Sequence, residues 1–433
     1  MRFALPCFGD VSPESWTVQR NRSVFELVDD RSVDGSEELL TVSHLTGVTK
    51  RAEKDVNMFL AETLEGYKRC QPGDLVINTM WAWMGALGIT PHDGIVSPSY
   101  HVYRLRRPSE HEPRYFDYVF RTPAYVTELT RHSRGVWTSR LRIYPDEFFD
   151  MEVWLPPLGQ QIAIADFLDR KTAAIDALIE KKQKLLELLA EKRSALITRA
   201  VTKGLDPNVP MKDSGIPWIG EIPAHWEVRP LGYCVTMQGG STPSKAVDAY
   251  WDGGVPWVTP KDMKSFEIHD SIDHISALAL RETSIRMVPA NTSLVVVRGM
   301  ILAKTLPVGF TIGPVSINQD MKALIPAGGL LPEFLSWQLL ARVPEARSLI
   351  EEAGHGTKTF RTDLFRAMNL LLPPLDEQVA IVGALKQEVA VSKDLGDRTR
   401  TVIKRLGEYR QALVTAAVTG QLAISSGTQV QPK

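Results

Sequence analysis

Apolar residues recur along two stretches of the chain at the spacing of long amphipathic helices. The first stretch runs from residue 160 to about 201, contains no proline or glycine, and is rich in Ala, Leu, Glu, Lys and Gln, which are good helix formers. Its apolar stripe consists of Leu168, Ile175, Leu178, Leu185, Leu189 and Leu196. The matching stripe of the second stretch consists of Leu385, Leu395, Val402, Leu406, Tyr409 and Leu413.

Helices of this length need a partner for their apolar stripe. About 40 residues at 1.5 Å each make a rod of roughly 60 Å, which is rarely stable alone in water. Gly396 and Gly407 each weaken the second helix by about 1 kcal/mol relative to alanine. We therefore expect the two helices to pack on each other, antiparallel, as an intramolecular coiled coil. The alternative is that each helix packs on its own globular block.

The two helical stretches are copies of one sequence. Leu155-Pro156-Pro157-Leu158 recurs as Leu372-Pro373-Pro374-Leu375, and the offset of 217 residues holds without a gap for 51 residues, of which 20 are identical. The prolines cannot lie inside a helix, so each helix is expected to begin after them. Weaker matches extend the repeat into the preceding blocks, for example Gly94-Ile95-Val96-Ser97 with Gly313-Pro314-Val315-Ser316. The chain is therefore interpreted as two copies of one module.

The blocks that precede the helices mix strand and helix patterns. Buried-strand runs occur at 76–77 and 294–297, helical patterns at 117–130 and 331–349, and 204–222 has the glycine and proline content of a linker. The expected fold class is α+β, with two mixed α/β domains joined by the paired helices and an internal pseudo-twofold repeat. The expected boundaries are 1–154 for the first domain, 155–205 for the first helix, 206–371 for the linker and second domain, 372–424 for the second helix, and 425–433 for a tail.

Charge excludes a generally polycationic DNA-binding protein. The chain has 50 basic and 51 acidic residues, so its net charge is −1. The two mixed blocks are net negative, at −4 for 1–154 and −2 for 206–371, whereas the helical blocks carry +3 and +2. A local basic groove can still sit within a neutral chain, so any DNA contact would depend on locally clustered cations.

Cysteine content and hydropathy indicate an ordinary cytoplasmic protein. Cys7, Cys70 and Cys234 are too few and too far apart for a disulfide framework or a zinc site. No run of about 18 apolar residues is present, which argues against a membrane span. The chain start does not have the pattern of a signal peptide.

Motifs of the common catalytic sites are not found. The stretch Gly354-His355-Gly356-Thr357-Lys358-Thr359 has the wrong spacing for a phosphate-binding loop. A nuclease-like Pro145-Asp146 followed by Glu152-Val153-Trp154 has tryptophan at the catalytic lysine position, and the Leu-Pro-Pro-Leu pairs lack the flanks of an amino-methyltransferase motif. The nine histidines show no metal-binding spacing. We therefore expect a non-catalytic chain without a metal or cofactor of its own.

The duplicated helix heads resemble a known family. Leu155-Pro156-Pro157-Leu158-Gly159-Gln160-Gln161-Ile162 and Leu372-Pro373-Pro374-Leu375-Asp376-Glu377-Gln378-Val379 each precede a long helix. Two further stretches match, namely the run from Asp213 to Trp226, which contains Gly-Ile-Pro-Trp-Ile-Gly, and Gly240-Ser241-Thr242-Pro243-Ser244 with Tyr250-Trp251. The chain resembles the DNA-specificity subunit of type I restriction–modification systems over essentially its whole length. The first block departs most, because it lacks a counterpart of Gly-Ser-Thr-Pro-Ser.

The resemblance implies a mechanism and a set of partners. Two target-recognition domains would each read one half of a bipartite double-stranded DNA site. The paired helices would act as a spacer and as the dock for two methyltransferase subunits, which restriction subunits would join. S-adenosylmethionine, ATP and Mg²⁺ would belong to these partner subunits, and this chain would carry no catalytic residue.

Candidate DNA contacts are polar and basic residues on turn-rich stretches, since such groups grip phosphates or read base edges. In the second domain they are Ser241, Thr242, Lys245, Lys261, Lys358 and Arg361, and in the first they are Arg134, Arg140 and Arg142. The competing interpretation is that each cation is simply solvated on the surface. Trp81, Trp83, Trp251 and Trp257 are expected in the core rather than stacked on bases.

Two other functions remain open at this point. The chain could be a self-sufficient DNA-modifying enzyme, which methylation or cleavage of DNA by the purified chain alone would reveal. It could also be a scaffold protein without DNA contact, which specific DNA retention together with a methyltransferase partner would exclude.

The helix length generates a first prediction. A rod of about 60 Å corresponds to just under two DNA turns of roughly 34–36 Å, so we expect deletion of one heptad from both helices to change the preferred spacer between the half-sites. Neither half-site sequence should change. Sequencing of the methylated sites measures both properties, and an unchanged spacer would exclude a ruler role for the helices.

Overall fold

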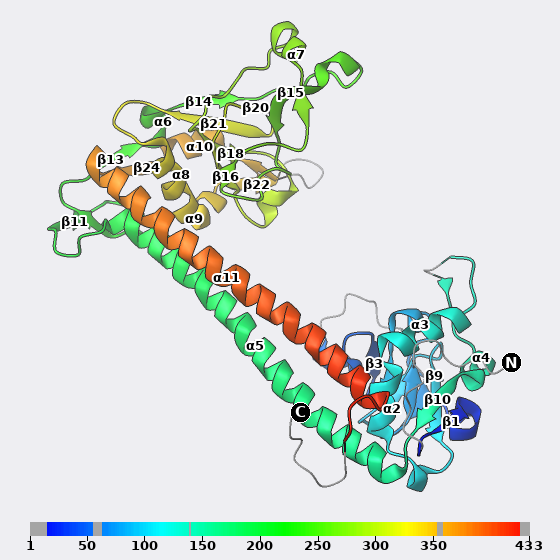
Figure 1. Ribbon diagram of the computed structural model, residues 1–433. Helices are drawn as coiled ribbons and strands as arrows, with labels where there is room; N and C mark the ends of the chain where they lie inside the picture. The colour runs from blue at the N-terminus through cyan, green and yellow to red at the C-terminus, as the bar shows by residue number, and fades with distance from the viewer. Residues whose placement is uncertain (1–14, 55–62, 138–139, 353–357, 425–433) are drawn as a thin grey trace. The chain divides into compact units, whose positions relative to one another are not determined.

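The computed structural model describes residues 15–54, 63–137, 140–352 and 358–424 (Figure 1). Cys7, the proposed tail 425–433 and most of the stretch resembling a phosphate-binding loop, residues 354–357, lie outside this part. By internal contacts the chain divides into two compact units, Met1–Gln183 with Arg400–Lys433, and Lys184–Thr399. Each unit contains one mixed α/β domain together with parts of both long helices.

The first unit is built on a four-stranded antiparallel sheet in the order β2-β9-β6-β7. Its buried face carries an aromatic core that includes Phe25, Phe116, Phe120 and Phe148. The strands are β1 (Thr17–Arg20), β2 (Phe25–Val28), β3 (Leu40–Ser43), β4 (Gly47–Lys50), β5 (Lys68–Cys70), β6 (Leu75–Ile77), β7 (Leu87–Ile89), β8 (Gly94–Val96), β9 (His101–Leu105) and β10 (Glu152–Leu155). The helices are α1 (Asn21–Val24), α2 (Pro113–Phe120), α3 (Pro123–His132) and α4 (Pro145–Asp150).

The second unit is built on a five-stranded sheet in the order β14-β21-β18-β19-β16 and a three-stranded sheet in the order β17-β15-β20. The predicted run 294–297 is buried here, and 293–296 forms the central strand β18. The strands are β11 (Met211–Asp213), β12 (Glu221–Pro223), β13 (Glu227–Pro230), β14 (Val235–Gly239), β15 (Trp251–Val258), β16 (Glu267–Ile268), β17 (His274–Ile275), β18 (Ser293–Val296), β19 (Val308–Thr311), β20 (Ser316–Ile317), β21 (Met321–Pro326), β22 (Ile350–Glu352), β23 (Lys358–Phe360) and β24 (Asn369–Leu372). The helices are α6 (Leu231–Cys234), α7 (Ala277–Glu282), α8 (Pro332–Ala341), α9 (Val343–Arg347) and α10 (Thr362–Ala367).

The two domains repeat the same order of elements. The first runs β1-α1-β2 at its start and α4-β10 at its end, with β1 antiparallel to β10. The second runs β13-α6-β14 and α10-β24, with β13 antiparallel to β24. Thr17 faces Leu155 in one ladder and Glu227 faces Leu372 in the other. The duplication in the sequence is therefore a duplication of structure, and the α+β class with an internal repeat is confirmed.

Prolines divide the two predicted domain helices. The pattern at 117–130 is met by α2 and α3, because Pro123 begins a new helix where its missing N–H costs nothing. The pattern at 331–349 is likewise met by α8 and α9, with Pro344 in the first turn of α9.

The predicted linker 204–222 is wrong in one respect. It contains β11 and the start of β12, and Ile216, Ile219 and Ile222 are buried in the core of the second unit.

The two long helices are α5 (Leu158–Lys203) and α11 (Leu375–Val418), and they lie side by side and antiparallel (Figure 1). In the first unit Arg410 Nε donates to Asp176 Oδ1 at 2.9 Å. In the second unit Lys192 Nζ lies 3.5 Å from Glu388 Oε1. Each domain core also includes the start of its own helix and the end of the other, for example Leu168 with Val418 in the first unit. The helices therefore pack on each other and on the domains, so both packings considered from the sequence occur together.

Half of the predicted stripe of α11 lies one residue away from the buried seam, whereas Leu385 is buried as predicted. Leu395, Val402 and Tyr409 are exposed, whereas Gly396 and Thr399 are buried. On α5, Leu178 is exposed and Thr172 is buried. Assignment of Leu178, Leu395, Val402 and Tyr409 to the packing stripe was wrong, because residues at i+3 and i+4 flank the same line on a helix and hydrophobicity alone chose the wrong flank.

The last residue of the Pro-Pro-Leu-x-x-Gln motif has the same buried role in both repeats. Gln161 Nε2 donates to Pro156 O at 2.8 Å, and Gln161 Oε1 accepts from Glu112 N at 3.0 Å. Gln378 Nε2 donates to Pro373 O at 2.9 Å, and Gln378 Oε1 accepts from Leu331 N at 2.7 Å. Both side chains are buried. The amide therefore ties the first turn of the long helix to the segment that enters α2 or α8.

Ion pairs at equivalent positions have opposite polarity in the two repeats. Arg114 of α2 lies 2.7 Å from Asp169 of α5. In the second unit Glu333 of α8 lies 2.7 Å from Lys386 of α11, and position 386 is 217 residues after position 169. Each domain thus holds its own helix with a pair of charges that the other domain reverses.

The glutamine contacts generate a stability prediction. Gln378→Leu leaves the carbonyl of Pro373 and the N–H of Leu331 without their buried partner, so we expect a loss of about 1–3 kcal/mol in the free energy of unfolding. That loss corresponds to a fall in melting temperature of roughly 2–4 °C per kcal/mol. Gln387→Leu, at an exposed position of the same helix, is the matched control. Equal melting temperatures for the two variants would contradict the tying role of Gln378.

Candidate nucleic-acid interface

Several strands of the second unit end at one edge of its sheets. β14 and β18 are both antiparallel to β21, and Gly239 and Val296 at their ends face Lys322 and Met321 at its start. β15 and β20 are parallel, and Val258 faces Ile317 at their ends. Because Ile317 and Met321 are separated by three residues only, all these ends meet at the same place. We call this place, with the loops that follow the strands, the sheet edge of the second unit.

The predicted residues Ser241 and Thr242 lie at this sheet edge. The Ser241 N–H donates to Ile317 O at 3.0 Å, and the Thr242 hydroxyl hydrogen-bonds the side chain of Gln319. Gly240 must be glycine, because a Cβ there would lie 2.0 Å from Ile317 O. The Gly-Ser-Thr-Pro-Ser stretch therefore lets the chain pass close to the loop after β20 and present hydroxyl groups beside it.

Arg298, Asn318 and Asp320 form a connected group at the same edge. Arg298 Nε donates to Asp320 Oδ1 at 2.7 Å, and Asn318 Nδ2 donates to Asp320 Oδ2 at 3.2 Å. Sequence reasoning missed these residues and Gln319. The signal that could have found them is their position, since Arg298 directly follows the buried run 294–297 and Asn318 directly follows 315–317.

Lys358 and Arg361 belong to the chain that borders this edge. Thr359 of β23 forms a β-bridge with Arg298, which places Lys358 and Arg361 on the same side of the domain. Lys358 pairs with Glu352, and Arg361 pairs with Asp363 and with Glu351. Hydrogen bonding to Arg361 holds the pKa of Asp363 at about 2, below its usual range.

The remaining predicted cations of this domain, Lys261 and Lys245, lie in the loops that follow β15 and β14 at the same edge. Lys261 follows the end of β15, and its ammonium lies 2.6 Å from Asp273, whose hydrogen bond raises the pKa of Lys261. Lys245 is exposed in the loop after Ser244. The structure thus brings the predicted residues of this domain toward one edge and ties most of the cations to carboxylates.

In the first unit the predicted arginines lie on a loop just before α4. Arg134 and Arg142 face each other in a β-bridge, and Arg134 also pairs with Glu147. Arg140 is exposed, as are the neighbouring apolar residues Val136 and Trp137. These arginines therefore occupy a position equivalent to Lys358 and Arg361, immediately before the last short helix of the domain.

The edge of the first unit has a different chemistry. Asp29 and Asp30 directly follow β2, at the positions equivalent to Gly239 and Gly240 at the end of β14. The carboxylate of Asp29 lies 3.5 Å from the ammonium of the buried Lys68. Thr79 follows β6 and donates its hydroxyl to Ser99 O at 2.8 Å. Burial lowers the pKa of His101 to about 4, which keeps that ring neutral at pH 7. The two domains therefore present unlike polar groups at equivalent edges.

The four tryptophans differ in their exposure. Trp257 is buried and donates its indole N–H to Ser241 O at 3.1 Å. Trp81 is 50% exposed and stacks on Trp83 with a centroid separation of 6.3 Å. The core assignment therefore holds for Trp257 and is wrong for Trp81, while Trp83 and Trp251 are half-buried.

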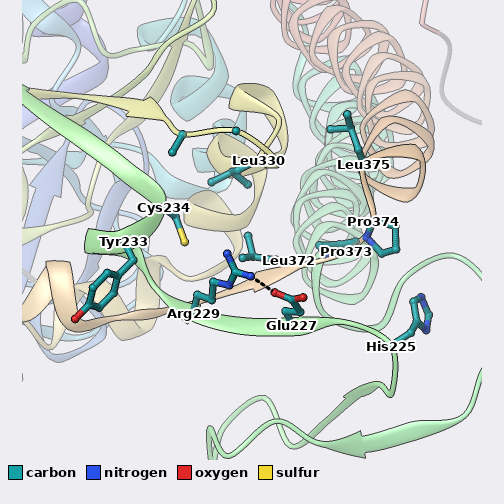
Figure 2. A pocket seen from close by; sticks show the side chains of 13 residues that line it. His225, Glu227, Arg229, Tyr233, Cys234, Leu330, Leu372, Pro373, Pro374 and Leu375 are labelled. Carbon is teal, nitrogen blue, oxygen red and sulfur yellow. Dashed lines mark hydrogen bonds and ion pairs between the residues drawn. The ribbon is translucent and has the colours of Figure 1, made fainter.

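A hollow of about 320 Å³ lies at the head of α11 (Figure 2). His225 Nε2 lies 2.5 Å from Glu377 Oε1, and Trp226 Nε1 donates to Glu377 Oε2 at 3.0 Å. Burial raises the pKa of the Cys234 thiol on its wall, which disfavours the nucleophilic thiolate.

Among the described residues no cluster of His, Cys, Asp or Glu is placed to hold a metal ion. No described helix is long and apolar enough to cross a membrane.

Comparison with known proteins matches parts of the chain to one family. Residues 223–405 match the model of the type I restriction modification DNA specificity domain. A stretch of 160 residues is 32% identical to the specificity subunit of the type I restriction enzyme EcoR124I/EcoR124II of Escherichia coli, covering 37% of this chain and 40% of that protein. A stretch of 123 residues is 34% identical to the MjaIX specificity subunit of Methanocaldococcus jannaschii, covering 27% of each. The matched regions span less than half the length of either relative.

Solved structures share the fold over nearly the whole chain. A chain from a study of complex assembly and conformational transition of the type I R-M system has a TM-score of 0.67 at 18% identity and covers 95% of this chain and 99% of that one. The HsdS subunit from Thermoanaerobacter tengcongensis has a TM-score of 0.50 at 19% identity, with 96% and 99% covered. Residues 223–405 thus match the type I restriction modification DNA specificity domain, parts of the chain are similar to type I specificity subunits, and the fold is shared over nearly the whole chain.

Proposed function

We propose that this chain is the DNA-recognition subunit of a type I restriction–modification complex, in which each domain reads one half of a bipartite double-stranded site. The observation that carries the proposal is the duplicated domain with unlike polar groups at its equivalent edges. A repeated fold suits two similar binding events, and different edge residues suit two different half-site sequences. The chain itself contributes recognition, and methyl transfer and cleavage belong to its partners.

The exposed start of each long helix suits the docking of a partner present in two copies. Ile162 of α5 and Val379 of α11 occupy equivalent positions and are 37% and 56% exposed. Single exposed aliphatic side chains are common on protein surfaces, but exposure at the same position of both repeats suits one kind of partner that binds each repeat in the same way. We assign these two positions to two methyltransferase subunits, which restriction subunits then join in the cytoplasm. S-adenosylmethionine, ATP and Mg²⁺ are cofactors of those partners.

The recognition role is tested by methylation. The chain is purified with its methyltransferase partner, incubated with DNA and S-adenosylmethionine, and the modified sites are sequenced. We expect one bipartite sequence to be methylated by the complex and no methylation or cleavage by the chain alone. Activity of the lone chain would favour a self-sufficient enzyme, and methylation without a preferred sequence would favour a scaffold role.

The docking positions generate a prediction about stoichiometry. Ile162→Glu and Val379→Glu each place a charge where an apolar contact is proposed, so each variant should lose one methyltransferase subunit from the complex. Leu188→Glu is the matched control, since Leu188 is 50% exposed on α5 and its equivalent in the second repeat is Arg405. Light scattering on the purified complexes gives the mass. An unchanged mass for both variants would exclude these positions as docks.

A further inference from the structure

Arg298 is held rigidly at the sheet edge of the second unit. The N–H of Val297 donates to Asp320 O at 2.7 Å on one side, and the N–H of Gly299 donates to Lys358 O at 3.0 Å on the other. The backbone around Arg298 is therefore fixed between the start of β21 and β23. A side chain that begins from such a position has little freedom in where it can reach.

The guanidinium of Arg298 is oriented by a carboxylate that is itself oriented. Asp320 Oδ1 accepts from Arg298 Nε at 2.7 Å. Asn318 holds Asp320 twice, through its Nδ2 on Oδ2 at 3.2 Å and through its Oδ1, which accepts from the Asp320 N–H at 3.1 Å. Because only Nε is engaged, the plane of the guanidinium is set while its outer end is left for another partner.

That outer end has no acceptor in the part of the chain that the structure describes. The one hydrogen bond of the Arg298 side chain there uses Nε, and the side chain is 51% exposed. The N–H donors on Nη1 and Nη2 therefore meet no acceptor among the described residues, and the Nε contact restricts their direction. This donor pair matches the O6 and N7 acceptors that guanine presents in the major groove.

Folding gives little reason for this arrangement. An exposed ion pair of this kind contributes about 0–1 kcal/mol to stability. The equivalent position in the first unit, the second after the end of β6, is Thr79, whose side chain is buried and bonded to Ser99 O. The repeated fold therefore does not require an arginine here.

We propose that Arg298 reads a guanine in the half-site bound by the second unit, with Asp320 as its positioning residue. The inference rests on the proposed DNA-recognition function. Gln319, Ser241 and Thr242 lie beside Arg298 and offer amide and hydroxyl groups to the neighbouring bases. The first unit lacks the corresponding donor, so the guanine contact belongs to the second half-site.

The test measures base preference at every position of the site. The full chain is assembled with its methyltransferase partner and competed against a library in which each base of both half-sites is varied in turn. For Arg298→Ala we expect discrimination in favour of one guanine in the second half-site to fall by roughly 5- to 150-fold, with preferences at all other positions retained. Arg298→Lys should lose the same discrimination while keeping more of the affinity, because an ammonium lacks the fork.

Further variants separate reading from charge and from folding. Asp320→Asn should weaken preference at the same single position, because the fork loses its charged support. Arg229→Ala removes an exposed arginine from β13, which precedes the end of β14 opposite the sheet edge, and should leave every preference unchanged. Thermal unfolding of each complex checks that the variants are folded, and the lysine variant keeps the test valid if the alanine variant is not.

The outcomes are distinguishable. A wild-type complex with a defined bipartite site and an Arg298→Ala complex with the same base preferences would overturn the guanine contact alone. A uniform loss of affinity across all sequences would also overturn it, since that is the signature of a phosphate contact. A wild-type complex without any preferred site would overturn the proposed function and this inference together.

Discussion

A buried glutamine amide couples each long helix to the domain that precedes it. The two prolines before the helix force an extended approach, and the strand just before them is fixed in a ladder, as β10 with β1 or β24 with β13. Gln161 and Gln378 then close the first turn back onto the proline carbonyl and onto the entrance of α2 or α8. The start of the helix therefore has a single orientation within its own unit. Any geometric relation between a helix and the adjacent sheet edge depends on these contacts.

Because both repeats use the same glutamine contacts, those contacts give no preference for the native pairing of a domain with its own helix. The neighbouring ion pairs do give such a preference. Arg114 faces Asp169 in the first unit, and Glu333 faces Lys386 in the second. A domain docked on the wrong helix start would place Arg114 against Lys386 or Glu333 against Asp169, and like charges in contact are unfavourable. The reversal therefore favours the native pairing over an exchanged one, without any change in the shared apolar packing.

Local sequence patterns predicted the repeat, the long helices and their starts, because proline, glutamine and heptad spacing act over a few residues. Leu395 was assigned to the seam of α11 in place of the adjacent buried Gly396, since the choice between adjacent flanks depends on the facing helix. Ser241 and Thr242 were predicted from the turn-rich Gly-Ser-Thr-Pro-Ser stretch, which the structure places at the sheet edge. Arg298 and Asp320 were missed because they are brought together by antiparallel pairing of β18 with β21, which no local pattern reveals.

The charges at the sheet edge bear on how such a nearly neutral domain could select DNA. Lys261, Lys358 and Arg361 are already paired with Asp273, Glu352 and Asp363. A phosphate that replaces one of these carboxylates exchanges one ion pair for another, so the gain in affinity is smaller than for a free cation. Arg298 differs, because its carboxylate partner uses Nε and leaves the outer donors unopposed. If this surface binds DNA as proposed, paired cations would add little sequence-independent attraction, and the positioned donors of Arg298 would decide which sequence is retained.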